Sequence, residues 1–123
     1  MKDYKDLISW QKSMQLAEEI YRLTKQLPKE ETYGLASQLR RAAVSVPSNI
    51  AEGYGREATA EYIRFLKIAR GSLYEIETQL YLCKTLQYIS QEDFSLSLSL
   101  ISEVGRMLNT MLRRLHGQIS TAN

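Results

Sequence analysis

The feature of this sequence that most constrains its fold is a run of apolar residues that repeats with the period of an α-helix. In the last third of the chain, such positions recur at alternating spacings of 4 and 3, namely Phe94, Leu98, Ile101, Gly105, Leu108, Leu112, Leu115 and Ile119. This spacing places all of these positions on one face of a helix. The pattern therefore predicts a long amphipathic helix with one buried face.

Three earlier segments show the same periodicity. The first carries two parallel stripes, a main one of Trp10, Met14, Ala17, Tyr21 and Thr24 and a second one of Leu16, Ile20, Leu23 and Leu27. The next segment has Ala36, Leu39, Ala43, Val46 and Ile50, and the third has Tyr62, Leu66, Ala69, Leu73, Ile76, Leu80 and Cys83. No segment alternates with the period of a half-buried strand. The chain is therefore expected to be all-α, with four helices.

The connections between these patterns are short, as in an antiparallel up-down four-helix bundle. "LPKEETYG" separates the first two helices and "LQYIS" the last two. A chain of 123 residues is long enough for one core. We expect a single domain over residues 1–123, with fraying at residues 1–6 and 117–123.

The segment "RRAAVSVPSNIAEGYGR", residues 40–56, contains a proline within a helical pattern. Pro47 cannot donate a backbone hydrogen bond, and its ring crowds the carbonyl of Ala43, so the helix must bend or break there. The alternatives are one kinked helix that continues to Gly53 and two shorter helices. Because the apolar spacing keeps its phase through the proline, we favour the kink.

Composition excludes several classes of function. No apolar run approaches the length of a membrane span, and the N-terminal "MKDYKDLISW" lacks the apolar segment of a signal peptide. Cys83 is the single cysteine and cannot form an internal disulfide, which favours a cytoplasmic protein. His116 is the only histidine, so the sequence offers neither a metal cluster nor a Cys/His couple. We therefore expect no metal, no cofactor and no catalytic site.

The last helix carries more apolar surface than one buried face requires. A second stripe consists of Leu96, Leu100, Val104, Met107 and Met111. This surplus, like the double stripe of the first helix, favours burial against another copy of the chain or against a partner protein. The alternative is a broad core with some exposed leucines.

"YGLASQLRRAAVSVPSNIAEGYGR", followed by "EYIRFLKIARGSLYEIETQLYLCKTLQYIS", resembles the four-helix-bundle family encoded by intervening sequences within bacterial 23S ribosomal RNA genes. "DLISWQKSMQLAEEIYRLTKQLPKEE" matches the first helix of that family, and the resemblance covers residues 7–115. The family is also similar to the accessory variability protein of diversity-generating retroelements, a pentameric barrel that binds nucleic acid and associates with a reverse transcriptase. The resemblance implies a bundle assembled as a ring of five, with a role in nucleic-acid binding.

Charge is distributed unevenly along the chain. Residues 32–70 carry six Lys/Arg against three acids, and residues 104–123 carry three against none, whereas residues 71–103 carry one Lys against five acids. In an antiparallel bundle the basic side chains would gather at the end that holds the second interhelical turn and both termini. A basic face can neutralise phosphates, although the same charges also suit ordinary solvated surface. The predicted phosphate-contacting residues are Arg56, Arg64, Lys67, Arg113 and Arg114.

These features give two hypotheses of different classes. The first is a non-enzymatic, oligomeric protein that binds RNA or DNA through the basic residues. The second is a scaffold that engages a protein such as a reverse transcriptase through the surplus apolar stripe. Arg40 and Arg41 are assigned either to ion pairs across a subunit interface or to phosphate contacts. The predicted interface residues are Arg40, Arg41, Leu100, Val104, Met107 and Met111.

Overall fold

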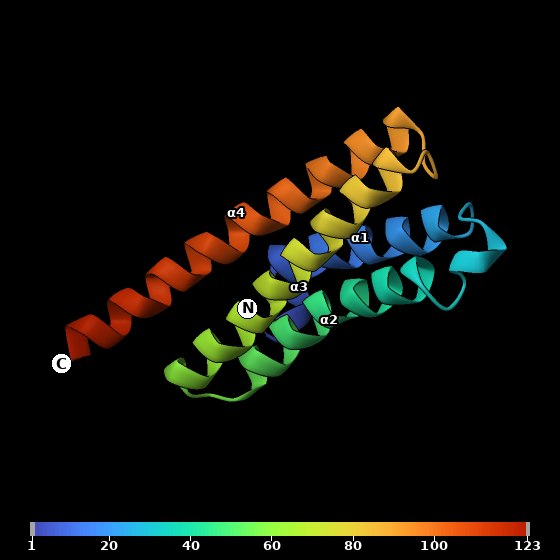
Figure 1. The fold of residues 1–123 in the computed structure, drawn as a ribbon. Helices are drawn as coiled ribbons and strands as arrows, with labels where there is room; N and C mark the ends of the chain where they lie inside the picture. Colours follow the sequence, from blue (N-terminus) through green and yellow to red (C-terminus); the bar gives the residue numbers. More distant parts are fainter. Residues whose placement is uncertain (1, 123) are drawn as a thin grey trace.

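A computed structural model describes residues 2–122, within which the chain forms four α-helices and no strand. The helices run alternately in opposite directions, so each is antiparallel to the next (Figure 1). The all-α four-helix prediction is therefore confirmed. The helices are α1 (Ile8–Thr24), α2 (Leu35–Gly55), α3 (Thr59–Thr85) and α4 (Gln91–Ala122).

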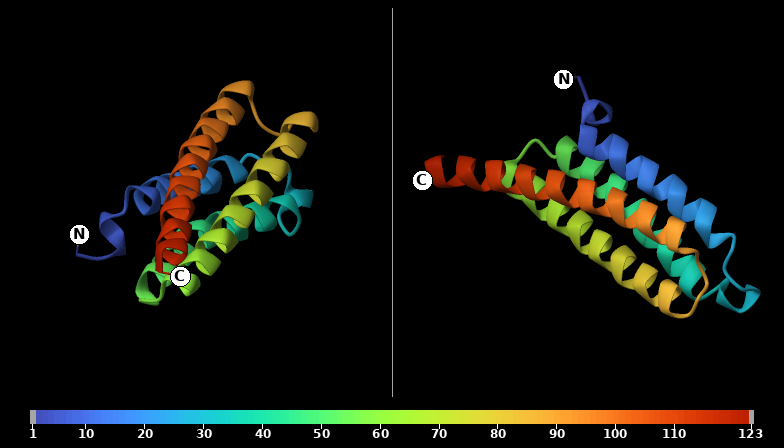
Figure 2. Two further views of the ribbon diagram at one scale, coloured as in Figure 1. Left: turned by 90° about the vertical axis from the view of Figure 1, so that its left-hand side faces the viewer. Right: turned by 90° about the horizontal axis from the view of Figure 1, so that it is seen from above.

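Each helix packs against two others, in the cyclic order α1, α2, α3, α4. The α2–α3 turn and the end of α4 lie at one end of the bundle, and α4 extends past the other helices there (Figure 2). Short 3-10 turns occupy Tyr4–Asp6 and Lys29–Glu31. Helix α4 includes residues 117–122, whereas Met1 and Asn123, where we also expect fraying, lie outside the described residues. Within residues 2–122, no helix combines the length and apolar character needed to cross a membrane.

Helix α2 continues without interruption from Leu35 to Gly55, with Pro47 buried inside it. The single helix favoured by the sequence is therefore confirmed over two shorter ones, and a bend at Pro47 stays a prediction. At the start of α2, the backbone N–H of Leu35 donates to the Glu31 carboxylate at 3.2 Å. At the start of α4, the backbone N–H of Asp93 donates to the Ser90 hydroxyl at 3.1 Å, which caps the helix.

The core confirms the predicted stripes of α2 and α3 and corrects that of α1. The predicted apolar positions of α2 are all buried, as are those of α3 except the partly buried Tyr62. In α1 and the turn that follows it, the second stripe is buried, together with Ser9, Ser13 and one member of the main stripe, Thr24. Met14 and Tyr21 of the predicted main stripe are instead exposed. Both stripes have helical spacing, so periodicity alone could not decide which one faces inward.

The buried face of α4 draws on both of its predicted stripes. Phe94, Ile101, Leu108 and Leu112 come from the main stripe, and Val104 comes from the second one. Leu98 and Leu115 are only partly buried. The inward face of α4 is thus rotated slightly from the predicted one.

Leu108 and Leu96 provide a matched test of this assignment. Leu108 is fully buried, whereas Leu96 is 49% exposed on the same helix. We expect Leu108→Ala to lower the free energy of unfolding by about 2–5 kcal/mol, because it leaves a cavity in the core. Leu96→Ala is expected to change it by less than about 0.5 kcal/mol. Urea denaturation followed by circular dichroism measures both, and equal effects would contradict the assigned core face.

Candidate nucleic-acid interface

The α2–α3 turn brings two of the predicted phosphate-contacting residues together. Helix α2 ends at Gly55, and Arg56 follows as its C-cap. Glu57 then adopts a left-handed conformation with φ of 60°, and the chain turns into α3. This short reversal places the Arg56 side chain against the first turns of α3.

A close approach of α2 to α3 supports this turn. A Cβ atom placed on Gly53 would lie 2.8 Å from Cβ of Phe65 and 3.0 Å from Cδ1 of Tyr62. Only glycine leaves room for the two α3 side chains at this distance. Tyr62 also packs edge-on against Tyr54, with ring centroids 6.2 Å apart. Burial, followed by the nearby Tyr54, raises the pKa of Tyr62 to about 12.

Phe65 is the platform on which the two arginines lie. Its side chain is buried, and the guanidinium carbons of Arg56 and Arg64 lie 5.0 Å and 4.4 Å from its ring centroid. Stacking of a guanidinium on an aromatic ring is favourable and leaves its N–H groups free for other partners. The ring therefore contacts two cations, both of which are exposed to solvent.

One of these cations has an acidic neighbour. Nε of Arg64 donates to the Glu61 carboxylate at 2.9 Å. This bond holds the pKa of the Glu61 carboxyl below its usual value and raises the pKa of Arg64. Since the pair is exposed to water, a phosphate can compete with Glu61 for Arg64 at little cost.

The other three predicted residues are exposed, and two of them lie on α4. Nη2 of Arg113 donates to the Thr110 hydroxyl at 3.2 Å. Arg114 borders a shallow hollow that also includes Tyr62 at the start of α3, so the arginines of α4 lie at the same end of the bundle as the Phe65 platform. Lys67 lies one turn beyond Arg64 on α3 and makes no hydrogen bond or ion pair within the described part of the chain.

The two arginines assigned to an interface differ in their surroundings. Nε of Arg40 donates to the Thr24 hydroxyl at 2.8 Å, and its guanidinium lies 5.1 Å from the Tyr21 ring, so it joins α2 to α1 within the chain. Arg41 is exposed beside a polar cleft between α2 and α3 that also includes Glu75. Over residues 2–122, Arg41 has no ion pair within 4.0 Å.

The predicted interface residues of α4 separate into core and surface. Val104 is fully buried in the core of its own chain, so it offers no free surface. Leu100 and Met107 are partly buried. Met111 is also partly buried, and its sulfur accepts a hydrogen bond from the Ser9 hydroxyl at 3.3 Å. Met107 and Met111 border a hollow between α1 and α4 whose other lining residues are Leu7, Ile8, Ser9, Arg106, Thr110 and Arg114.

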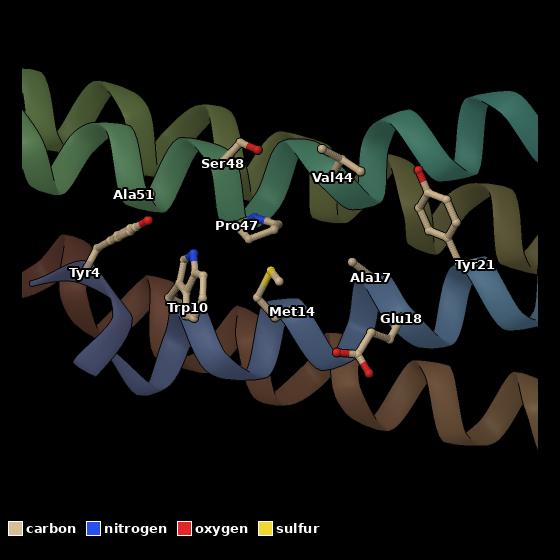
Figure 3. Close-up of a pocket in the computed structure, with 10 residues that line it drawn as sticks. All are labelled: Tyr4, Trp10, Met14, Ala17, Glu18, Tyr21, Val44, Pro47, Ser48 and Ala51. Atoms are coloured by element: carbon tan, nitrogen blue, oxygen red, sulfur yellow. The ribbon is translucent and has the colours of Figure 1, made fainter.

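A groove between α1 and α2 was not singled out from the sequence, although its signal was present. It has a volume of about 510 Å³ and is bordered by the outward stripe of α1. Figure 3 shows Trp10 and Met14 extending from α1 toward Pro47 of α2. Tyr4 stacks on Trp10, with ring centroids 5.3 Å apart. The surplus stripe of the first helix thus lines an open apolar groove.

The described residues contain no cluster of three His, Cys, Asp or Glu side chains that could hold a metal ion. Cys83 is buried in the core, and burial, followed by the nearby Glu31, raises the pKa of its thiol to about 11. A thiol with this pKa is almost entirely protonated at neutral pH and is a poor nucleophile.

Comparison with known families agrees with the bundle and its sequence signature. The family model for the 23S rRNA-intervening sequence protein matches residues 5–110. The chain belongs to the 23S rRNA-intervening sequence protein family. A search of curated proteins finds no match. Among solved structures, the chain is similar to a protein of unknown function from the S23 ribosomal protein family of Bacteroides thetaiotaomicron VPI-5482, with a TM-score of 0.79 and 26% sequence identity over 85% of this chain and 98% of that one.

Gly53 gives a direct test of how the arginine platform is built in this member of the family. We expect Gly53→Ala to lower the free energy of unfolding by about 1–3 kcal/mol, because its Cβ would collide with the base of the Phe65 side chain. Gly55→Ala is the control, because a Cβ there meets nothing within 4 Å. Thermal and urea unfolding measure both variants, and an unchanged stability of Gly53→Ala would contradict the close approach of α2 to α3.

Proposed function

We propose that this member of the family is a non-enzymatic, oligomeric protein that binds structured RNA through the basic end of the bundle. The observation that carries the proposal is the pair of guanidiniums on Phe65, at 5.0 Å and 4.4 Å from the ring, at the same end as Arg113 and Arg114. Because the ring restricts both side chains, little conformational entropy remains to be lost when they bind a phosphate.

Binding of this kind draws its free energy from the release of counterions. Phosphates would contact Arg56, Arg64, Lys67, Arg113 and Arg114. Glu52, Glu57 and Glu61 surround the same turn, so we expect moderate affinity and a strong dependence on salt. The family name refers to 23S rRNA, which makes fragments of that RNA the first ligands to test.

The proposal includes assembly into a ring of five copies, as the resemblance to the retroelement accessory protein implies. Parallel copies in such a ring would place their basic ends on one face. The cationic surface would then be repeated around the ring, and one RNA could contact several copies. Multivalent contact of this kind raises the overall affinity without new types of contact.

The proposal predicts salt-sensitive binding of RNA. For wild-type protein freed of nucleic acid, we expect the logarithm of the RNA-binding constant to fall with the logarithm of the salt concentration. The slope should be about −4 for each bound chain, because five phosphates are contacted. A variant with Arg56→Glu, Arg64→Glu and Lys67→Glu should bind at least about tenfold more weakly and with a shallower slope. Fluorescence anisotropy with labelled structured RNA and duplex DNA measures both.

The control is Lys25→Glu, which reverses an exposed charge at the other end of the bundle. The oligomeric mass of each variant is measured to separate assembly from binding. Absence of binding by the wild-type protein at low salt would overturn the proposal.

The hollow between α1 and α4 supports a second candidate function, a scaffold for a protein such as a reverse transcriptase. Met107 and Met111 lie beside Leu7 and the 56% exposed Ile8, with Arg106 and Arg114 at the edge. Methionine is adaptable and is common at protein-binding surfaces. Such a surface would bind an apolar segment of a partner protein.

This scaffold function predicts a complex with little salt dependence. We expect Met107→Glu, and also Leu100→Glu, to weaken capture of a purified retroelement reverse transcriptase about tenfold or more, because each places a charge in an apolar contact. Ser99→Glu, at an exposed position of α4, is the control. Capture is measured at low and high salt, with the oligomeric mass of each variant. Capture that is unchanged in Met107→Glu would contradict this candidate.

A further inference from the structure

The outward face of α2 carries two opposite charges that form no ion pair among residues 2–122. Arg41 and Glu52 are both exposed, and between them Ser48 and the 44% exposed Val44 are also open to solvent. Neither Arg41 nor Glu52 takes part in an ion pair within 4.0 Å among residues 2–122. This exposed strip, composed of Arg41, Val44, Ser48 and Glu52, is called the α2 strip below.

The neighbouring charges do not satisfy these two side chains. Glu75 of α3 shares a cleft with Arg41 but lies beyond ion-pair distance. Near the other end of the strip, Glu52 contributes a weak attraction to Arg64, whose bonded partner is Glu61. Arg41 and Glu52 are eleven residues apart on one helix, so about 16 Å separates them and they cannot pair with each other.

The order of residues along the strip is self-complementary. Arg41 and Glu52 lie at equal distances from a midpoint between Val46 and Pro47. When two such helices lie antiparallel with their midpoints together, each arginine faces the glutamate of the other helix. Small side chains at the centre permit helix axes to approach to about 8–10 Å.

We propose that the α2 strip docks antiparallel on the α2 strip of a second copy about a twofold axis, with Arg41 of each copy paired with Glu52 of the partner subunit. The same surface is used by both copies, so the contact is isologous. This inference goes beyond the ring proposed above, whose contacts would be head-to-tail.

The observations favour a second copy over nucleic acid as the occupant of this face. The strip carries one positive and one negative charge, so it has no net attraction for phosphates. Val44 and Ser48 also border the apolar groove, as Figure 3 shows, and the charged residue among its lining side chains is the acidic Glu18. A protein surface with apolar side chains and matched charges suits such a face, whereas a polyanion does not.

Charge reversal tests the proposed pairing. Arg41→Glu and Glu52→Arg each place like charges at both ends of the contact, and we expect each to raise the dissociation constant for self-association about tenfold or more. The double variant restores opposite charges and should associate as the wild-type protein does. A mixture of the two single variants should also associate, because the arginine of one meets the glutamate of the other.

Two measurements follow the association. Sedimentation equilibrium gives the mass over a range of concentrations. Trp10 is the only tryptophan and lies in the groove beside the strip, so its emission should shift as copies associate. Lys25→Glu reverses an exposed charge at the end of α1 and is the control. Circular dichroism checks that each variant folds, which is expected because neither strip charge forms an ion pair in the described part of the chain.

Each contrary outcome has a separate meaning. Five copies whose assembly is insensitive to all charge reversals would overturn the α2 contact and leave the ring intact. A folded double variant that fails to associate would overturn the Arg41–Glu52 pairing. A wild-type protein that is monomeric at all concentrations would overturn both the contact and the ring. If Arg41→Glu weakens RNA binding with no change in mass, the strip binds nucleic acid and the inference fails.

Discussion

The packing of α2 against both of its neighbours is the constraint on which the rest of the bundle depends. Its inward side chains, Ala43, Val46 and Ile50, are buried in the core. On one flank Arg40 joins it to α1, and on the other the Ser45 and Ser72 hydroxyls lie 2.8 Å apart across the contact with α3. Small residues let these contacts form close to the helix axis, and larger ones would separate the helices. The proline-containing signature therefore encodes the contacts of α2 with the core and with both neighbouring helices.

The sequence predicted the helices well because each one carries an apolar stripe of helical spacing. It failed to identify the inward stripe of α1, for a physical reason. The buried face of α1 includes Ser9 and Ser13, and the Ser13 hydroxyl donates to the backbone carbonyl of Trp10 at 2.8 Å, so its polarity is satisfied locally. The outward stripe contains large aromatic residues that make it look like core. Two neighbouring apolar stripes were therefore available, and only contacts with α2 and α4 decide which of them faces inward.

The sequence predicted which basic residues lie at the candidate site, but not the contacts that hold them there. The up-down topology was enough to place Arg56 and Arg64 at the same end of the bundle as Arg113 and Arg114. The role of Phe65 could not be predicted, because the contact of its ring with two guanidiniums depends on the turn after Gly55 and on the approach at Gly53. The side-chain bond of Arg40 to α1 was missed for the same reason. Sequence order fixes which end a charge occupies, whereas tertiary contacts determine whether it is free.

The proposed pairing of α2 strips is compatible with RNA binding at the basic ends. In an antiparallel pair, Arg56 of each copy lies about nine to ten residues from the midpoint of the contact, on opposite sides of it. At 1.5 Å per residue, about 28 Å separates the two arginines along the helix direction. This distance exceeds the Debye length of about 8 Å at physiological salt, so the two cationic ends barely repel each other. A ring alone would gather basic ends on one face, whereas twofold pairing directs them to opposite faces. Two chains joined by this contact would therefore bind RNA at opposite ends, without competition between self-association and RNA binding.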